Sequence, residues 1–335
     1  MLVSFYVVGF LHLFFSTLVK RNGHFINKNV FLSNECKSET IDSGRSYVNE
    51  QVSIYNCFFR RLSEYSGSGG VISISGSYFT MKIELTMFYN CLCSTSGGAI
   101  YFSSENCTLY KVCAFRITSS SYYHFAYLEV AKTVTIDLLS LSTSSYSSIG
   151  DTSLGLRNGD QSFTHSNISY NMARVASTIL TKAAGKILFS YFTLADNYVS
   201  CCICLQLSQS IGDVLYANII NNNSPSYGVV HLWSSGTYTM QYCIYFENQN
   251  TLLCADSGSM TLSNCFISHA FVILSGPVTT INNNTLLRTQ SYAHQFYMSY
   301  YCNADNPVTE DSRKHTKVFY NFYHISFYLG FCFLE

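Results

Sequence analysis

Carboxylates are the first residues to test in this sequence, because acid/base chemistry on sugars needs two of them close together. The nine Asp residues are dispersed, and only Glu310-Asp311 places two carboxylates side by side. Asp137 and Asp160 are 23 residues apart and could stack if the chain repeats at that interval. No Lys or Arg stands at a matching offset to complete a site. These spacings disfavour a polysaccharide lyase or hydrolase, which we keep as an alternative.

Cysteine and histidine give no stronger signal for chemistry. The chain has 14 Cys, with close pairs at Cys91-x-Cys93 and in Cys201-Cys202-Ile203-Cys204. A structural zinc site usually joins two such pairs over a short spacer, and these pairs are too far apart. The nine His form no His-Glu-x-x-His group, and no Gly-x-Ser-x-Gly elbow is present. We therefore expect no catalytic residue, no metal and no cofactor, and interpret most cysteines as small buried hydrophobes beside a few disulfides.

A repeat organises the chain around these residues. The pattern is apolar-x-x-(central residue)-x-apolar, and successive central residues are separated by 29, 27, 26, 28, 25, 26, 25, 22 and 19 residues. Such a period is typical of stacked repeat units. The central residues are Cys57, Thr86, Cys113, Leu139, Asn167, Phe192, Asn218, Cys243, Cys265 and Asn284.

This period predicts an all-β chain folded as a right-handed, single-stranded parallel β-helix, or solenoid, of about ten turns. Each turn would hold three short strands, so that like positions stack along the axis. Stacking selects against charge, and charged residues are only 11% of the chain, whereas 27 Tyr and 25 Phe are present. We expect at least seven central residues to be in register, with Asn167, Asn218 and Asn284 in an amide ladder.

Two glycine pairs carry a more specific signal. Gly69-Gly70-Val71-Ile72 is followed 28 residues later by Gly97-Gly98-Ala99-Ile100. The second resembles the Gly-Gly-Ala-Ile motif of the polymorphic outer-membrane-protein repeats, and the family's Phe-x-x-Asn motif is matched at Phe31 and Asn34. That family and similar protist surface proteins form parallel β-helices associated with adhesion, which is what the resemblance implies for about a third of the chain. We expect the glycines to form tight corners and to allow close approach of the next turn.

The termini and four sequons bear on the compartment. Leu2–Val19 is apolar and predicts that residues 1–21 are a signal peptide or an anchor, followed by the β-helix over 22–300. Residues 301–335 form a tail that ends as a last strand or as a truncated membrane segment. Asn222 is the best glycosylation candidate because we expect it in an exposed turn, and Asn106 and Asn283 follow. The fourth sequon, at Asn167, is at a ladder position where a glycan would prevent stacking.

The functional expectation follows from these points. Nineteen basic and nineteen acidic residues cancel, so nothing favours nucleic acid as a partner. We expect a non-enzymatic protein, on the cell surface or secreted, that acts as an adhesin or antigen toward a host-cell surface, extracellular matrix or glycan. Membrane association would come through the termini. The alternatives are the carbohydrate-active enzyme and a structural spacer of a larger surface array.

Overall fold

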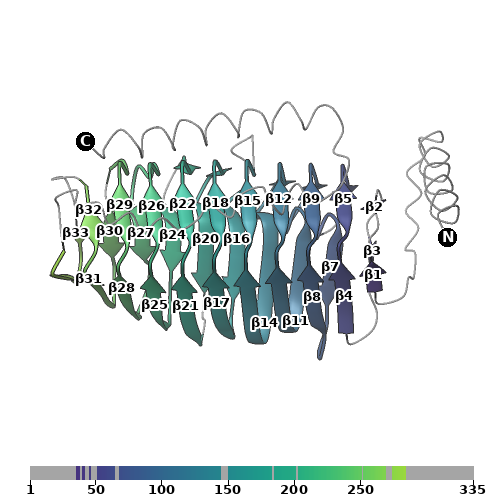
Figure 1. Cartoon of the computed structure of the whole chain (residues 1–335), viewed down its shortest axis with the longest axis horizontal. Helices are drawn as coiled ribbons and strands as arrows, with labels where there is room; N and C mark the ends of the chain where they lie inside the picture. The colour runs from purple at the N-terminus through teal and green to yellow at the C-terminus, as the bar shows by residue number, and fades with distance from the viewer. Residues whose placement is uncertain are drawn as a thin grey trace, which may run out of the picture. The chain divides into compact units, whose positions relative to one another are not determined.

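Parallel β-strands stacked turn upon turn make up the described part of the chain in a computed structural model. The structure describes residues 35–37, 40–41, 45–46, 51–64, 68–144, 150–182, 185–200, 203–250, 252–268 and 274–283. Every strand pairing among the described residues is parallel and joins neighbouring turns (Figure 1). The predicted all-β parallel solenoid is confirmed, with about eight well-described turns and a more fragmentary turn at either end. Its right-handedness remains a prediction.

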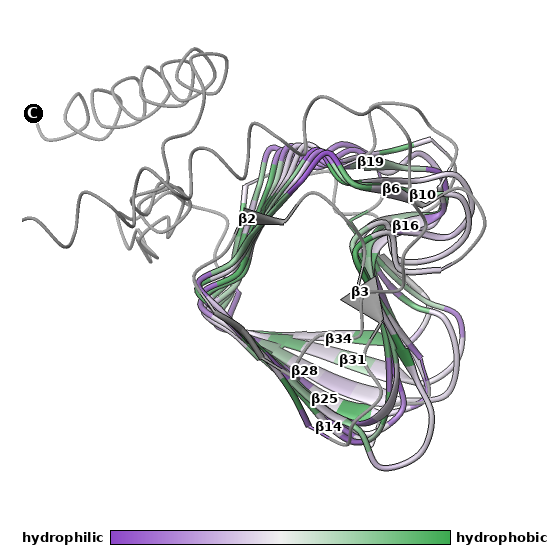
Figure 2. Cartoon of the chain, turned by 90° about the vertical axis from the view of Figure 1, so that its right-hand side faces the viewer, coloured by the Kyte–Doolittle hydropathy of each residue, from purple (hydrophilic) through white to green (hydrophobic). Residues whose placement is uncertain are grey.

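Three faces enclose the core, and they superpose when viewed along the stack (Figure 2). Two faces belong to one 19-stranded sheet, because β11 (Ile100–Tyr110) and β14 (Tyr123–Asp137) run continuously from one face to the other. The other strands of the first face are β1 (Glu35–Lys37), β4 (Gln51–Tyr55), β8 (Thr80–Glu84), β17 (Asp160–Thr164), β21 (Lys186–Ser190), β25 (Ile211–Leu215), β28 (Thr237–Gln241), β31 (Ser259–Ser263) and β34 (Val278–Ile281).

The second face is a ten-stranded sheet of very short strands. They are β2 (Thr40–Ile41), β5 (Phe58–Arg60), β9 (Met87–Tyr89), β12 (Cys113–Phe115), β15 (Ser140–Ser142), β18 (Asn167–Ser169), β22 (Thr193–Ala195), β26 (Asn218–Ile220), β29 (Ile244–Phe246) and β32 (Phe266–Ile267).

The third face completes each turn. With the first halves of β11 and β14, it holds β3 (Arg45–Ser46), β7 (Ile72–Ser75), β16 (Thr152–Arg157), β20 (Ala176–Lys182), β24 (Ile203–Leu207), β27 (Gly228–Leu232), β30 (Leu253–Ala255) and β33 (Leu274–Ser275). Short pieces between the second and third faces form two small sheets, of β6 (Ser63–Glu64), β10 (Leu92–Cys93) and β13 (Thr118–Ser119), and of β19 (Met172–Ala173) and β23 (Tyr198–Val199).

The core forms because alternate side chains of each strand point inward. On the first face, β4, β17 and β25 bury their second and fourth residues. One continuous cluster of buried apolar side chains results. On the second face the middle residue points inward, so Phe59 and Phe88 stack with ring centroids 5.1 Å apart.

Left-handed residues make the two corners that flank the second face. One such residue precedes and one follows each of the eight short strands from β5 to β29, with φ between 44° and 59°. The first-corner column is Asn56, Leu85, Lys111, Leu138, His165, Tyr191, Tyr216, Tyr242, Asn264 and Asn282; the second-corner column is Arg61, Asn90, Arg116, Thr143, Tyr170, Asp196, Asn221 and Glu247. Each conformation costs a non-glycine residue about 1–2 kcal/mol. The peptide N–H then donates to the next turn, as from Tyr191 to the carbonyl of Leu215 (3.0 Å), which satisfies the backbone at the bend.

The glycine pairs form the close contacts that their sequence predicts. Gly69 and Gly97 have φ of 73° and 69°, a region that favours glycine. A Cβ on Gly98 would lie 2.2 Å from the carbonyl oxygen of His124, and one on Gly70 would lie 2.4 Å from that of Gly98. Because these neighbours are backbone atoms, only glycine fits. The glycines therefore form tight corners at which the next turn approaches closely.

An asparagine ladder exists, but at residues other than those predicted. Asn171, Asn197, Asn222 and Asn248 follow the second corner on four successive turns. Each of the first three donates its side-chain amide to the next Asn at 3.0–3.1 Å and to a main-chain carbonyl of the preceding turn. The first three side chains are buried. This ladder satisfies backbone groups that the corner leaves without strand partners.

The predicted register is partly wrong. Six of the ten central residues share one position, directly before a strand of the second face: Cys57, Thr86, Leu139, Phe192, Cys243 and Cys265. Cys113, Asn167 and Asn218 are one position later, paired with Met87, Ser140 and Thr193. Asn284 lies outside the described residues. Six in register is one short of the expected seven, and the Asn167–Asn218–Asn284 ladder is not formed as predicted, because Thr193 separates the first two.

Most described cysteines are buried thiols. Seven are buried outside any disulfide, at positions 91, 93, 107, 204, 243, 254 and 265, whereas Cys57 and Cys113 are disulfide-bonded. Burial raises the pKa of the Cys91 thiol to about 12, so it stays protonated. Within the described residues, no helix is long and apolar enough to cross a membrane. Residues 1–21 and 301–335 lie outside that part of the chain.

Candidate functional site

A stack of four aromatic rings follows the first corner over successive turns. His165, Tyr191, Tyr216 and Tyr242 all occupy the left-handed position there. Neighbouring ring centroids are 5.3, 4.8 and 5.1 Å apart, and neighbouring planes differ by only 8° to 10°. His165 and Tyr191 are exposed, and the other two are half-exposed. We call these four residues the aromatic column.

A carboxylate and a hydroxyl lie at one end of the column. The Oδ1 atom of Asp137 lies 2.8 Å from Nδ1 of His165, and it also accepts a hydrogen bond of 2.8 Å from Thr164. Asp137 and Thr164 are directly opposite on β14 and β17. This end is therefore polar and fixes the orientation of the imidazole.

The orientation of the rings decides what the column presents to a ligand. Rings stacked between turns cover much of one another's faces, so they present edges and phenol groups to solvent. The result is an amphipathic strip, with carbon edges beside hydroxyls at intervals of about one strand spacing, ~4.8 Å. The sequence pattern did not predict this strip, because the repeat is defined by residues expected to point into the core.

Asp137 and Asp160 do not stack. Asp137 is paired with Thr164 and Asp160 with Thr133, so they occupy opposite ends of neighbouring strands on the first face. The Asp160 carboxylate accepts a hydrogen bond of 2.9 Å from the N–H of Lys186. The pair that the sequence offered for acid/base chemistry is therefore not assembled.

A polar cluster of Tyr127, Glu129 and Arg157 lies on the third face, and the sequence did not predict it. Glu129 and Arg157 are directly opposite on β14 and β16. Tyr127 donates to Glu129 (3.1 Å), and Arg157 stacks over the Tyr127 ring at 5.3 Å. Burial, with a smaller contribution from Glu129, raises the pKa of Tyr127, which makes it a poor general base. These three residues contain one carboxylate, and Asp151 acts electrostatically on Tyr123, which accepts a hydrogen bond of 3.3 Å from Arg157.

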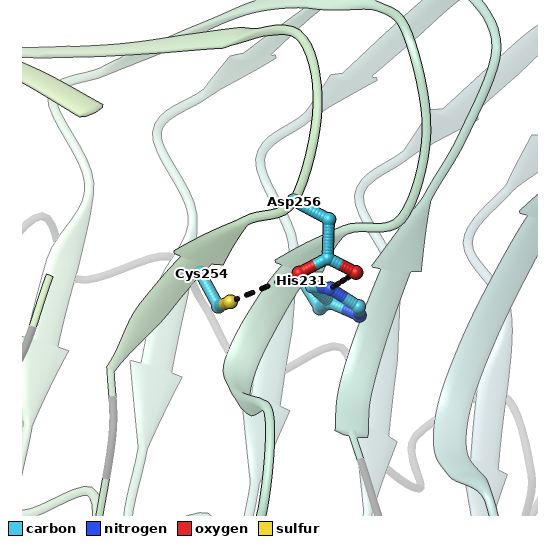
Figure 3. Close-up of side chains that lie close together, drawn as sticks. All are labelled: His231, Cys254 and Asp256. Atoms are coloured by element: carbon cyan, nitrogen blue, oxygen red, sulfur yellow. Dashed lines mark hydrogen bonds and ion pairs between the residues drawn. The ribbon is translucent and has the colours of Figure 1, made fainter. Parts of the chain in front are cut away.

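A second cluster lies on the third face near the end of the stack (Figure 3). His231 on β27 is directly opposite Cys254 on β30, and Asp256 follows two residues later on the same side. Nε2 of His231 lies 3.1 Å from a carboxylate oxygen of Asp256, and the Cys254 thiol donates to the other oxygen at 3.6 Å. The imidazole is fully buried and the carboxylate is exposed. Its signal in the sequence is the 23-residue offset between His231 and Cys254, which equals one local turn.

The sequons fall in contrasting places. Asn222 is fully buried in the asparagine ladder, so the prediction of an exposed turn is wrong. Asn106 is half-exposed on β11 and accepts a hydrogen bond of 2.9 Å from Thr133. Asn283 is half-exposed and bonds to the backbone of Cys265 and Leu262.

The residues that carry the family resemblance are divided by the structure. Gly69, Gly70, Gly97 and Gly98, with Ala99 and Ile100, form stacked corners and the buried start of the third face. Their packing is within the stack and leaves the glycines no free edge. Phe31 and Asn34 lie outside the described residues. Searches for relatives find no family model, no curated protein and no solved structure that matches the chain.

Proposed function

We propose that this chain is a non-enzymatic β-solenoid that binds an extracellular partner, acting as an adhesin or antigen on a cell surface or after secretion. The observation that carries the proposal is the aromatic column. A rigid stack holds Tyr191, Tyr216 and Tyr242 in fixed order, so binding them orders no flexible loop.

The chemistry of the column favours a glycan as the partner. A sugar chain alternates C–H faces with hydroxyls, and the column alternates ring edges with phenol groups and ends at the Asp137–His165 pair. Aromatic rings with a polar handle suit such half-wet contacts. The balanced net charge of the chain adds no attraction for a strongly anionic ligand.

Two observations support the non-enzymatic part of the proposal. Asp137 and Asp160 are on separate columns, and the Glu129–Arg157 group offers one carboxylate beside a tyrosine whose pKa is raised. A glycosidase or lyase needs a second acid or base in reach of the same bond.

A glycan panel tests the proposal. The full chain is incubated with neutral and acidic polysaccharides, and both retention and product release are measured. We expect retention of a neutral glycan without product, and at least a tenfold weaker affinity for Tyr216→Ala. Tyr78→Ala is the matched control, because Tyr78 is also left-handed (φ 73°) and is 70% exposed. Equal loss in both variants, or product release, would overturn the proposal.

A further inference from the structure

The His231–Cys254–Asp256 cluster has the composition of a transition-metal site. A nitrogen, a sulfur and an oxygen ligand come from three side chains, and their ligand atoms all lie within 4.8 Å of one another. Tetrahedral zinc, with bonds of about 2.0–2.3 Å, places its ligand atoms about 3.3–3.8 Å apart. One carboxylate oxygen of Asp256 is 3.1 Å from Nε2 of His231 and the other is 3.6 Å from the sulfur of Cys254, so the three side chains need to close by about 1 Å to reach that range around one ion.

The fold itself brings the three ligands together. His231 and Cys254 stand opposite each other on adjacent parallel strands, where Cα atoms of neighbouring strands are ~4.8 Å apart. Asp256 is two residues beyond Cys254, so its side chain leaves the chain on the same side. Both strands are fixed by the stack, and the ligands are therefore preorganised.

The buried imidazole of His231 gives a second, independent indication that an ion binds here. His231 is fully buried, and neither ring nitrogen has a hydrogen-bond partner among the described residues, including Nε2, the nitrogen that faces Asp256. Buried polar atoms without partners are uncommon, and an ion is one of the groups that accounts for them. Tyr227 stacks on the ring at 5.3 Å and Trp233 meets it edge-on at 5.6 Å, so the ring cannot turn away.

A catalytic cysteine triad is the other use of these three residue types. In such a triad the thiol meets the imidazole, and the carboxylate binds the far side of the ring. Here the carboxylate stands between the two, accepting from the thiol through one oxygen and facing Nε2 with the other (Figure 3). The three ligand atoms lie within 4.8 Å of one another, which suits a shared metal ion better than the relay of a triad.

We propose that His231, Cys254 and Asp256 bind one divalent transition metal ion of the zinc class. Sulfur and imidazole ligands together favour zinc over magnesium or calcium. The exposed carboxylate of Asp256 gives the ion its route of entry. This site is separate from the aromatic column and does not depend on the proposed function.

Cobalt substitution tests the site in the full chain under reducing conditions. Co²⁺ is titrated, and the thiolate-to-cobalt band is recorded in the near ultraviolet. We expect one equivalent bound, release by excess Zn²⁺, and loss of the band in Cys254→Ser. Asp256→Asn, at an exposed position that leaves the fold intact, is expected to bind at least tenfold more weakly.

Cys107→Ala is the matched control, because Cys107 is a buried thiol on β11 far along the stack. It should keep the band and the affinity. Absence of a band in the wild-type chain, its persistence in Cys254→Ser, or its loss in Cys107→Ala would overturn the proposal. Circular dichroism of each variant separates loss of the site from loss of the fold.

Discussion

Asn197 binds Asn222 on the next turn twice, through its peptide N–H (3.1 Å) and its side-chain amide (3.0 Å), and both bonds end on the same oxygen. The same double contact joins Asn171 to Asn197 and Asn222 to Asn248. The ladder thus fixes the spacing of four turns at a corner where the strand pairing is interrupted.

Replacing Asn197 tests the energetic weight of this ladder. Asn197→Leu keeps the branched shape of the side chain, but it leaves the N–H of Asn171 buried without an acceptor and removes the side-chain donor of the Ile168 carbonyl. At about 1–3 kcal/mol for each such group, the free energy of unfolding should fall by about 3 kcal/mol. Urea denaturation measures it. Asn223→Leu, which breaks two exposed bonds, to Gln249 and from Asn250, should change the free energy of unfolding by less than about 1 kcal/mol. Equal effects would contradict the ladder's role.

The glycine corner should tolerate no side chain. In Gly98→Ala the new Cβ would lie 2.2 and 2.5 Å from two carbonyl oxygens, those of His124 and Thr118. Because backbone must move, we expect a loss of at least about 2 kcal/mol in thermal or urea unfolding. Gly185→Ala is the control, since its nearest contact is the movable Asp160 carboxylate, and its stability should stay within about 0.5 kcal/mol. A stable Gly98→Ala protein would disprove the close approach.

His124 should make stability depend on pH. Burial lowers its pKa from 6.5 to about 4, and its Nδ1 accepts a hydrogen bond of 3.1 Å from Ser119. The unfolded chain therefore binds a proton between pH 6.5 and pH 4 that the folded chain does not, so stability falls as the pH drops through that window. The fall is about 3 kcal/mol. Urea unfolding at pH 7 and pH 4 should show that the wild-type chain loses about 3 kcal/mol more stability than His124→Gln over this interval. An equal loss in the two proteins would refute the prediction.

The sequons predict a site-specific pattern of glycosylation. When the chain is secreted from a glycosylating host behind a supplied signal peptide, the folded product should carry glycan at Asn106 and none at Asn222. The Asn222 amide donates to Leu194 and to Asn248 inside the stack, and a glycan would replace one of its hydrogens. Peptide mass spectrometry gives the occupancy. Glycan at Asn222 in folded protein would show that the ladder opens.

The sequence predicts the architecture well because the period and the glycine pairs both reflect backbone stacking. It predicts the register less well, since a shift of one residue exchanges the inner and outer faces. Tyr110-x-x-Cys113 matches the pattern as well as the inward set of Leu109 and Val112 does, because outer positions here are also apolar.

The candidate sites were harder to predict for a different reason. Left-handed corner positions accept Lys111, Leu138 and Tyr191 alike, so they leave no signature in residue type. His231 meets Cys254 only through pairing between turns, and the 23-residue interval is shorter than the period of the middle repeats.

The two corner columns differ from the core in how far their residue types vary from turn to turn. Their residues include Asn, Lys, Arg, Thr, Asp, Glu, His and Tyr, and all adopt one backbone shape. Exchanging one for another changes the outer rim of a turn and leaves the inward cluster untouched. A chain built this way can change its exposed corner side chains one rung at a time, about every 4.8 Å, without altering the core.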